Sequence, residues 1–440
     1  MTTARRQILL PRWLVPVAPE GAILERTGVL VEDGEILDLV PFDEIDARAA
    51  GAERVELDRH ALIPGLVNMH THSAMALLRG IADDLPLMRW LEDHIWPAES
   101  AIMGPSYVRA GSRLAVAEML AGGTTCFNDN YFFPDVTAEV AIEAGMRGVV
   151  GMPMIRFPTA WAETEDDYLR RGLEVHQALV DEPLISTSFV PHAPYSVSDS
   201  AFERIRTLAE ELDISVHLHL LEAAGEIESS RGEYGLHPLD RLDRLGLLGP
   251  RLLAVHMTQI DDDDIARLAR RGVHVLHCPE SNLKLASGLC PVAKLDSAGV
   301  NVCIGTDGAA SNNDLDMFGE MRTTALLAKG VSGDPEAVPA ARALSMATLH
   351  GARALGLDDR IGSVEPGKRA DLAAVRLDAL ATTPVHNVIS QLVYSAHAGM
   401  VSDVWVDGRR VKSGGTLTTV DVHEVRAEAE TWRRRITESS

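Results

Sequence analysis

The amino-acid sequence predicts an α/β protein: a (β/α)8 TIM barrel with a small β-sandwich domain built from both chain termini. From about residue 62 onward, short runs rich in Val, Ile and Leu alternate with helical patterns, which is typical of parallel strands connected by helices. The segment 66–307 that holds this alternation is similar in length to the ~250 residues of a typical barrel of this kind.

Candidate strands and helices can be placed one by one along the barrel region. The strands end at or near residues 70–72, 126–129, 151–154, 190–192, 217–219, 255–256, 276–277 and 304–307. Between them, segments such as Ala201–Leu212 have a helical pattern. The acidic run Asp261–Asp264 stands directly before an arginine-rich segment. We interpret that run as a solvated helix start and not as a cation site, because acids at the start of a helix and bases at its end match its dipole.

The two ends of the chain predict β structure. Asp33-Gly34 and Asp407-Gly408 each stand between alternating strand residues, and such a pair is the strongest short signal of a hairpin. Neither end is long enough to close a good core alone. We therefore expect residues 1–61 and 365–440 to build one β-sandwich domain together, beside a barrel of residues 62–364.

Composition restricts the class of partner. Hydrophobic residues make up 46% of the chain and charged residues 24%, as in ordinary globular proteins. The net charge is −23 and no basic block offsets it, so we expect a small-molecule substrate, no nucleic acid and no membrane. No signal-peptide core and no run of about 18 apolar residues occurs, which indicates a cytoplasmic protein. The four cysteines form no CxxC and are expected to be buried thiols.

Histidine and aspartate recur at the carboxyl ends of the predicted strands, where barrel enzymes place their chemistry. His70 and His72 are two residues apart in a strand, so both imidazoles can reach one cation. His219, His256 and Asp307 end or follow three further strands. One such histidine could be an ordinary core residue, but the set together predicts a metal site. Imidazole and carboxylate ligands without a paired thiolate suit Zn²⁺, and also Fe²⁺ or Mn²⁺.

A divalent ion in such a site lowers the pKa of bound water toward ~7, so the sequence predicts hydrolysis or hydrolytic deamination. Glu222 lies three positions after His219 and could shuttle a proton, although a helix-start glutamate fits the same pattern. The motifs HExxH and GxSxG, the phosphate-binding GxxxxGK loop and the His-x-Glu with Pro-Cys-x-x-Cys of other zinc deaminases do not occur. The ligands must therefore come from the barrel.

Several longer strings resemble known proteins over nearly the whole chain. Those resembling the amidohydrolase superfamily are PGLVNMHTH at 64–72, GTT at 123–125, GTDG at 305–308 and GSVEPGKRADL at 362–372. Those resembling its 5-methylthioadenosine/S-adenosylhomocysteine deaminases are LLRG, WL and WPAE within 77–99, PHAPY at 191–195, SNLKL at 281–285 and TDGAASNN at 306–313.

The resemblance implies one divalent metal ion, Zn²⁺ with Fe²⁺ and Mn²⁺ as alternatives. Its implied ligands are His70, His72, His219 and Asp307, with His219 taking precedence over His217, which falls deeper in the same strand. Two-metal relatives bridge their ions with a carboxylated lysine on the fourth strand. Residues 185–190 contain no lysine, which favours a single ion.

The resemblance also implies a reaction and a substrate pocket. Hydroxide on the metal attacks C6 of an adenosine analogue, Glu222 protonates N1, and His256 and Asp307 hold and accept the water proton. The products are the inosine analogue and ammonia. The implied substrate-binding residues are Trp90 in the pocket wall, Glu99 on the ribose hydroxyls, His192 on the purine edge, and Glu222.

The identity of the substrate stays open among 5′-methylthioadenosine, S-adenosylhomocysteine and adenosine. Some relatives hold the S-adenosylhomocysteine carboxylate with arginines after the third strand. Arg156 is the only base in residues 151–158 and is a substrate-binding candidate of undefined role. An apolar wall of Met152 and Met154 would favour the methylthio group. Guanine, 8-oxoguanine and s-triazines are alternative substrates for which a ribose-binding Glu99 would have no use.

Two further questions stay open at this stage. A non-catalytic structural relative is the alternative from a different class, and the presence of all the expected ligands argues against it. A homo-oligomer is compatible with such a barrel, but no stripe of residues in the sequence proves an interface.

Overall fold

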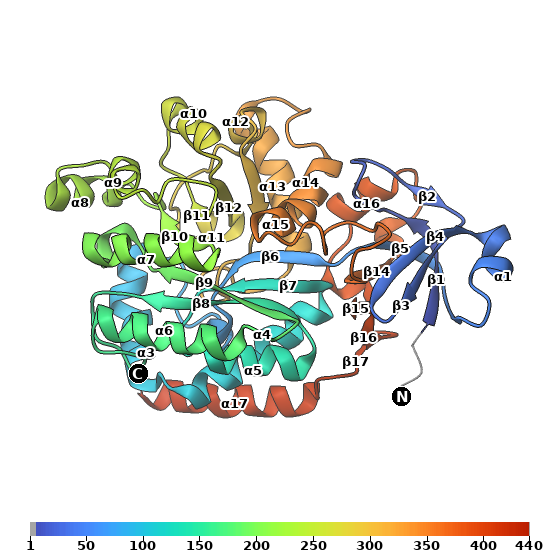
Figure 1. Cartoon of the computed structure of the whole chain (residues 1–440), viewed down its shortest axis with the longest axis horizontal. Coiled ribbons are helices and arrows are strands. Elements are labelled where there is room, and N and C mark those ends of the chain that lie inside the picture. The colour runs from blue at the N-terminus through green and yellow to red at the C-terminus, as the bar shows by residue number, and fades with distance from the viewer. Residues whose placement is uncertain (1–5, 440) are drawn as a thin grey trace.

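The computed structural model describes residues 6–439, which form a barrel and, at one end of it, a smaller sheet (Figure 1). In this described part of the chain, eight parallel strands follow one another around the barrel in sequence order. They are β6 (Leu66–Thr71), β7 (Thr124–Asp129), β8 (Arg147–Met154), β9 (Ile185–Pro191), β10 (Val216–Leu220), β11 (Leu252–His256), β12 (His274–His277) and β13 (Asn301–Ile304). The predicted barrel and its strand ends are confirmed; only β10 ends one residue beyond the expected range.

Helices follow the strands of the barrel, and several of them, such as those between β7 and β10, cover its outer face (Figure 1). Before β10 they are α2 (Leu87–Trp90), α3 (Trp96–Ile102), α4 (Pro105–Ala121), α5 (Pro134–Ala144), α6 (Glu165–Leu179) and α7 (Asp199–Leu212). After it come α8 (Gly225–Tyr234), α9 (Pro238–Arg244), α10 (Asp262–Arg271), α11 (Pro279–Lys284), α12 (Val292–Ser297), α13 (Met317–Ser332), α14 (Ala340–Met346) and α15 (Leu349–Ala354). None of the helices in residues 6–439 combines the length and the apolar character needed to cross a bilayer.

The acidic run before α10 is a helix start, as predicted. The carboxylate of Asp261 accepts hydrogen bonds from the backbone N–H groups of Asp263 and Asp264, and Gly272 ends the helix in the left-handed conformation. The carboxylates of this run therefore satisfy free N–H groups of the first turn, and they lie where the helix dipole favours negative charge.

The barrel closes where β13 meets β6. The backbone N–H of Asp307 donates to the carbonyl of His70 at 2.9 Å, and the N–H of Thr306 donates to Oδ1 of Asn68 at 3.0 Å. A Cβ atom on Gly305 would lie only 2.5 Å from the backbone nitrogen of His70. Only glycine permits this close approach, which brings the segment before Asp307 against the strand that carries His70.

An apolar cluster packs the outer faces of several barrel strands against α15 and the segment that follows it. Its strand members include Val67, Cys126, Leu253, Leu276 and Cys303, each fully buried. All four cysteines of the chain are buried and free, as the sequence predicted. The cluster therefore holds α15 against the strand that carries His70.

The smaller sheet is built from both ends of the chain, as predicted. Among the described residues it contains β1 (Arg6–Leu14), β2 (Leu24–Glu25), β3 (Thr27–Glu32), β4 (Glu35–Pro41), β5 (Glu53–Pro64), β14 (Leu372–Arg376), β15 (Val401–Val406), β16 (Arg409–Ser413) and β17 (Thr416–Leu417). The N-terminal and C-terminal parts join where β5 pairs antiparallel with β14. The short helices α1 (Ile45–Arg48) and α16 (Val388–Tyr394) belong to the same two chain segments.

The two Asp-Gly pairs form the predicted hairpin turns and also touch each other. Asp33 and Gly34 have φ values of 49° and 84°, and Asp407 and Gly408 have values of 50° and 73°. These paired positive φ angles are those of a two-residue hairpin turn whose twist matches the strands. A Cβ atom on Gly408 would lie 2.5 Å from Cα of Gly34, so the two turns pack backbone against backbone.

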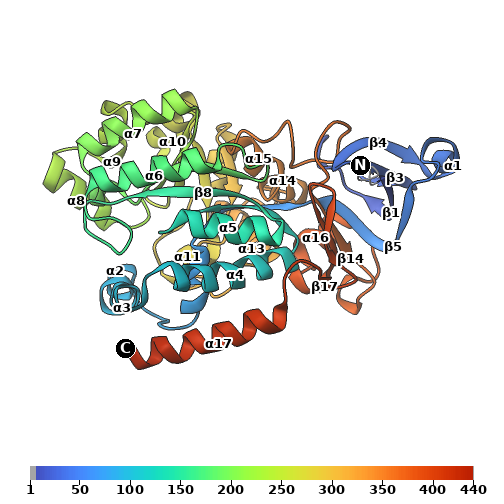
Figure 2. The same ribbon diagram turned by 60° about the horizontal axis from the view of Figure 1, so that its bottom comes forward.

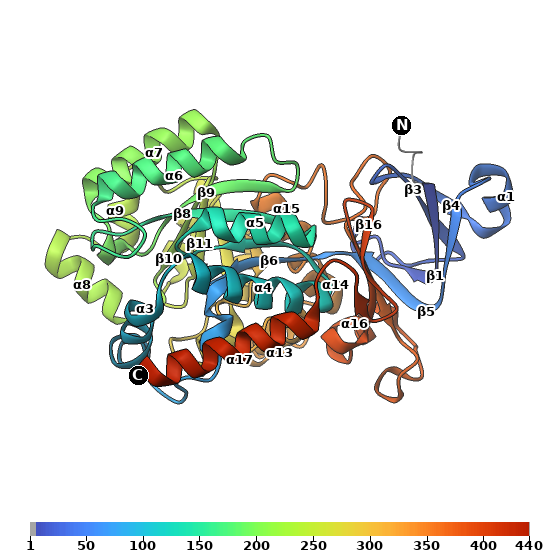
Figure 3. The ribbon, with the colours of Figure 1, turned by 90° about the horizontal axis from the view of Figure 1, so that it is seen from below.

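Two features connect the small sheet to the barrel. Arg147, at the start of β8, donates two hydrogen bonds to the buried carboxylate of Asp371, at 2.8 and 3.1 Å. The long terminal helix α17 (Val422–Ser439) leaves the sheet and runs along α4 to the region of α3 (Figures 2 and 3). There the ring of Trp432 meets that of Tyr107 edge to face, with centroids 5.6 Å apart.

Candidate metal centre and active site

Four side chains from three strand ends converge at the carboxyl rim of the barrel. His70 lies in β6 and His72 one residue beyond it, while His219 lies in β10 and Asp307 three residues beyond β13. Nε2 of His70 and Nε2 of His72 each lie 3.3 Å from Oδ1 of Asp307, and Nε2 of His219 lies 3.3 Å from Nε2 of His72. The sequence-predicted ligands therefore come together around one point.

The opposite nitrogen of each imidazole has its own hydrogen-bond partner. Nδ1 of His72 donates to the carbonyl of Asn130, and Nδ1 of His219 donates to the carbonyl of His192 at 2.7 Å. Nδ1 of His70 lies 2.8 Å from Nε2 of His217. A neutral imidazole carries one proton, so a proton on Nδ1 leaves a lone pair on Nε2. Histidine ligands of metals are held in this way.

The donor set fits a divalent cation. His70 Nε2 is buried and has no hydrogen-bond partner among the described residues, which is costly for a polar atom unless another group binds it. Burial lowers the pKa of His70 to about 4 and lowers that of His219 well below its usual range, so both rings are neutral at pH 7. Neutral imidazole is the form that binds a metal ion.

The second oxygen of Asp307 is held away from the cluster. Oδ2 accepts a hydrogen bond from the hydroxyl of Ser281 at 2.6 Å, while Oδ1 faces the histidines and accepts from the N–H of Gly308 at 2.8 Å. Asp307 itself has a φ of 62°, a left-handed conformation that costs energy for a residue other than glycine. The chain thus maintains a strained backbone where it presents this carboxylate.

Glu222 and His256 form a pair beside the four converging side chains. Oε2 of Glu222 lies 3.7 Å from Nε2 of His256, and Oε1 of Glu222 accepts from the hydroxyl of Ser287 at 3.2 Å. Nδ1 of His256 donates to Oδ1 of Asn282 at 2.8 Å. Burial raises the pKa of Glu222, so this carboxyl group is better able to carry a proton near neutral pH than an exposed glutamate.

Two of the expected substrate-binding residues lie next to the four converging side chains. The ring of His192 is 5.0 Å from that of His219 between centroids, and its Nδ1 is 3.1 Å from the hydroxyl of Ser196. Glu99, on α3, accepts a hydrogen bond from the hydroxyl of Tyr131. The ring of Tyr131 lies 6.4 Å from that of His72, which links Glu99 to the rim of the site.

Trp90 and Arg156 are less directly connected to the cluster. Trp90, at the end of α2, is 6% exposed, and its indole N–H has no partner among the described residues. The guanidinium of Arg156 donates to Oε1 of Glu233 on α8 at 2.7 Å and lies over the ring of Phe157. Arg156 is thus already paired, with its side chain about one-third exposed.

The expectation that Met152 and Met154 form an apolar wall of the substrate pocket is wrong. Met152 packs against α6, where a Cβ atom on Gly172 would lie 3.0 Å from Cβ of Met152. Residues two apart in a strand share a face, so Met154 points toward the same outer side of β8. An apolar run in a barrel strand does not indicate whether its side chains face the barrel interior or the surrounding helices. Here α6 covers the side chains of Met152 and Met154. These methionines give no preference for a methylthio group.

Several supporting residues had no assigned role in the sequence. Ser281 and Asn282 belong to the string that resembled the deaminases, but their contacts with Asp307 and His256 depend on how α11 meets two other strand ends. No sequence pattern indicated a role for Glu226 in the site. Its carboxylate accepts from the N–H groups of residues 221–223 and so fixes the loop that carries Glu222.

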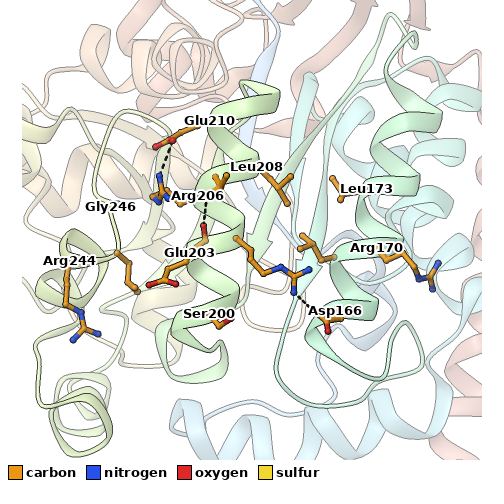
Figure 4. A pocket seen from close by; sticks show the side chains of 14 residues that line it. Asp166, Arg170, Leu173, Ser200, Glu203, Arg206, Leu208, Glu210, Arg244 and Gly246 are labelled. Atoms are coloured by element: carbon orange, nitrogen blue, oxygen red, sulfur yellow. Dashed lines mark hydrogen bonds and ion pairs between the residues drawn. The ribbon is translucent and has the colours of Figure 1, made fainter.

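A groove of about 1100 Å³ on the outer side of the barrel is separate from this cluster (Figure 4). It lies between α6, α7 and the end of α9, and none of its lining residues belongs to the converging set. Most of its charged residues are already paired, for example Arg206 with Glu210 at 3.1 Å and Arg244 with Asp199 at 2.6 Å. The groove therefore offers no convergent polar groups comparable with those at the rim.

Comparison with known proteins gives a consistent result. The model of the Amidohydrolase family matches residues 61–411. The 5-methylthioadenosine/S-adenosylhomocysteine deaminase of Saccharophagus degradans is 47% identical, over 98% of this chain and 96% of its own length. The 5′-deoxyadenosine deaminase of Methanothermobacter thermautotrophicus is 44% identical, over 92% and 94%.

A solved structure agrees with the sequence relatives. The crystal structure of an adenosine deaminase from Xanthomonas campestris with bound zinc has 53% sequence identity, covers 98% of each chain and superposes with a TM-score of 0.97. The barrel and the His-rich site thus define a metal-dependent hydrolase, and the chain belongs to the amidohydrolase family. Within it, full-length relatives carry the name 5-methylthioadenosine/S-adenosylhomocysteine deaminase.

Removal of a divalent ion is expected to lower the thermal stability of the protein. An ion that binds only the folded chain stabilises it by about 2.7 kcal/mol at a free concentration one hundred times its dissociation constant. The unfolding temperature, measured with saturating metal and with excess chelator, should therefore differ. His219→Ala should abolish this difference, whereas His423→Ala, at an exposed position on α17, should retain it. Equal unfolding temperatures for the unchanged chain would contradict a metal site.

Proposed function

We propose that this protein hydrolytically deaminates adenosine analogues to the corresponding inosine analogues and ammonia. The expected substrates are 5′-methylthioadenosine, S-adenosylhomocysteine or both, with adenosine as a further candidate. The observation that carries the proposal is the convergence of three histidine Nε2 atoms and Oδ1 of Asp307 beside the Glu222 and His256 pair. The names of relatives at 44% and 47% identity support the nucleoside substrate class.

In this proposal, the residues that hold the metal ion are His70, His72, His219 and Asp307. Zinc is the ion we favour, because it suits three imidazoles and one carboxylate and because the Xanthomonas campestris structure contains it. Fe²⁺ and Mn²⁺ also accept these ligands. When bound, such an ion would act as a Lewis acid and make water a nucleophile near neutral pH.

The remaining catalytic residues transfer protons. Glu222 protonates N1 of the adenine ring, and its raised pKa favours the protonated form that this step needs. Asn282 keeps the proton of His256 on Nδ1, so that Nε2 can accept a hydrogen bond from the attacking water. His256 and Asp307 together orient that water and receive its proton. Protonation of N1 makes C6 electron-poor. The proton taken from the water passes to the C6 amino group, which then leaves as ammonia.

The proposed substrate contacts place the ribose at Glu99 and the purine edge at His192. The hydroxyl of Tyr131 holds one oxygen of Glu99, and the second oxygen remains to accept from the ribose hydroxyls. Burial lowers the pKa of His192 to about 4, so a neutral ring faces the base. Trp90 contributes to the pocket wall, with an indole N–H that still lacks a partner among the described residues.

The substrate class is tested by ammonia release from the zinc-loaded protein. 5′-Methylthioadenosine, S-adenosylhomocysteine and adenosine should be deaminated, whereas guanine, 8-oxoguanine and an s-triazine should not. Turnover of a free base or a triazine with no turnover of any nucleoside would overturn the proposed substrate. A zinc-loaded protein that is inactive on all six compounds would argue for a non-catalytic relative.

Glu99→Gln is expected to lower kcat/KM for 5′-methylthioadenosine by about 10- to 100-fold, because a hydrogen bond to a charged group contributes about 1.5–3 kcal/mol. The loss should disappear with 2′,3′-dideoxyadenosine, which lacks the 2′- and 3′-hydroxyls that Glu99 is proposed to bind. Steady-state kinetics with both substrates provide the measurement. Glu92→Gln, an exposed change close to α3, is the matched control. An equal loss on both substrates would contradict the ribose contact.

Arg156 is expected to influence the choice between S-adenosylhomocysteine and 5′-methylthioadenosine. Its guanidinium is paired with Glu233, so an amino-acid carboxylate must compete for it. Glu233→Gln should therefore raise the ratio of kcat/KM for S-adenosylhomocysteine over 5′-methylthioadenosine, and Arg156→Met should lower it. If neither variant changes the ratio, Arg156 does not contact the substrate.

A further inference from the structure

His217 lies directly behind the proposed metal ligands. It precedes the ligand His219 by two residues in β10, so the two imidazoles share the inner face of the barrel. The side chain is fully buried, and its Nε2 lies 2.8 Å from Nδ1 of His70. The two rings meet edge to face, at 84° and 4.9 Å between centroids. A buried polar side chain in this position requires a reason.

The hydrogen bond between the two histidines can run in only one direction when His70 binds a metal. A ligand His70 must present a lone pair at Nε2, so its proton is on Nδ1 and is donated to His217. Nε2 of His217 is then the acceptor and its own proton is on Nδ1. The opposite direction would place a proton on Nε2 of His70, where it would face Oδ1 of Asp307 and block the metal.

The other two histidine ligands are oriented differently. His72 and His219 donate to backbone carbonyls, which can only accept, so the backbone alone fixes their protons on Nδ1. The partner of His70 is an imidazole, which can either donate or accept. Of these three ligands, only His70 therefore depends on another side chain for the position of its proton.

We propose that His217 is a positioning residue that keeps the proton of His70 on Nδ1 and so directs the Nε2 lone pair of His70 toward the metal. This inference rests on the proposed metal site. Nδ1 of His217 has no hydrogen-bond partner among the described residues, so no contact there compels the reverse direction. The side chain thus acts through His70 and does not itself bind the ion.

The test compares two amides at position 217 that differ in reach. His217→Gln can place a carbonyl oxygen near the position of the lost Nε2 and accept from His70, whereas the shorter side chain of His217→Asn cannot. Removing such a supporting contact typically weakens metal binding by about 10- to 100-fold. We expect a loss of that size for Asn and a clearly smaller one for Gln. The zinc dissociation constant, measured by competition with a chelating dye, reports this without turnover.

Controls separate this effect from damage to the fold. The same two substitutions at His277, a buried histidine that bonds to none of the converging side chains, should leave zinc affinity unchanged. The circular dichroism of each metal-free variant checks folding, and His217→Leu replaces the Asn variant if that one does not fold. Equal zinc affinities for the Gln variant and for the one that cannot accept would overturn the role of His217. Failure of the unchanged chain to bind zinc would instead overturn the proposed function.

Discussion

The hydrogen bonds at the Nδ1 atoms of three histidines are the constraint on which the site depends. Each fixes a ring so that its Nε2 faces the same point. Each partner comes from a different part of the barrel: Asn130 after β7, His192 after β9 and His217 within β10. The convergence therefore requires the whole barrel to be closed. A change in the position of any one of these strand ends would turn a ring away from the others.

The backbone conformations at the rim are consistent with this demand. His256 and Asp307 adopt positive φ angles of 74° and 62°, as does Leu221, at 53°, next to Glu222. Such conformations cost free energy and persist only where surrounding contacts maintain them. Glu226 and Ser281 provide contacts of this kind, through the loop after β10 and through Oδ2 of Asp307. Stability is thus lost locally at the residues that would perform the chemistry.

The sequence predicted the barrel and the converging ligands because both depend on local patterns. Strand ends are marked by apolar runs followed by His or Asp, and these runs place His70, His219 and Asp307 at one rim. The contacts of Ser281 and Asn282 were not predictable, because they depend on the angle at which a short helix meets two other strands. The predicted direction of the Met152 side chain was also wrong, because alternation along a strand does not indicate which face a helix covers.

The pairing of β5 with β14 has a consequence for the order in which the protein can form. Strand β5 is synthesised early, but residues 372–376, which cover one of its edges, follow only after the entire barrel sequence. Until then that edge presents unpaired N–H and C=O groups to other chains, a known route to aggregation. Completion of the small sheet is therefore a late event in biogenesis. It can occur only after the catalytic barrel between its two halves has been synthesised.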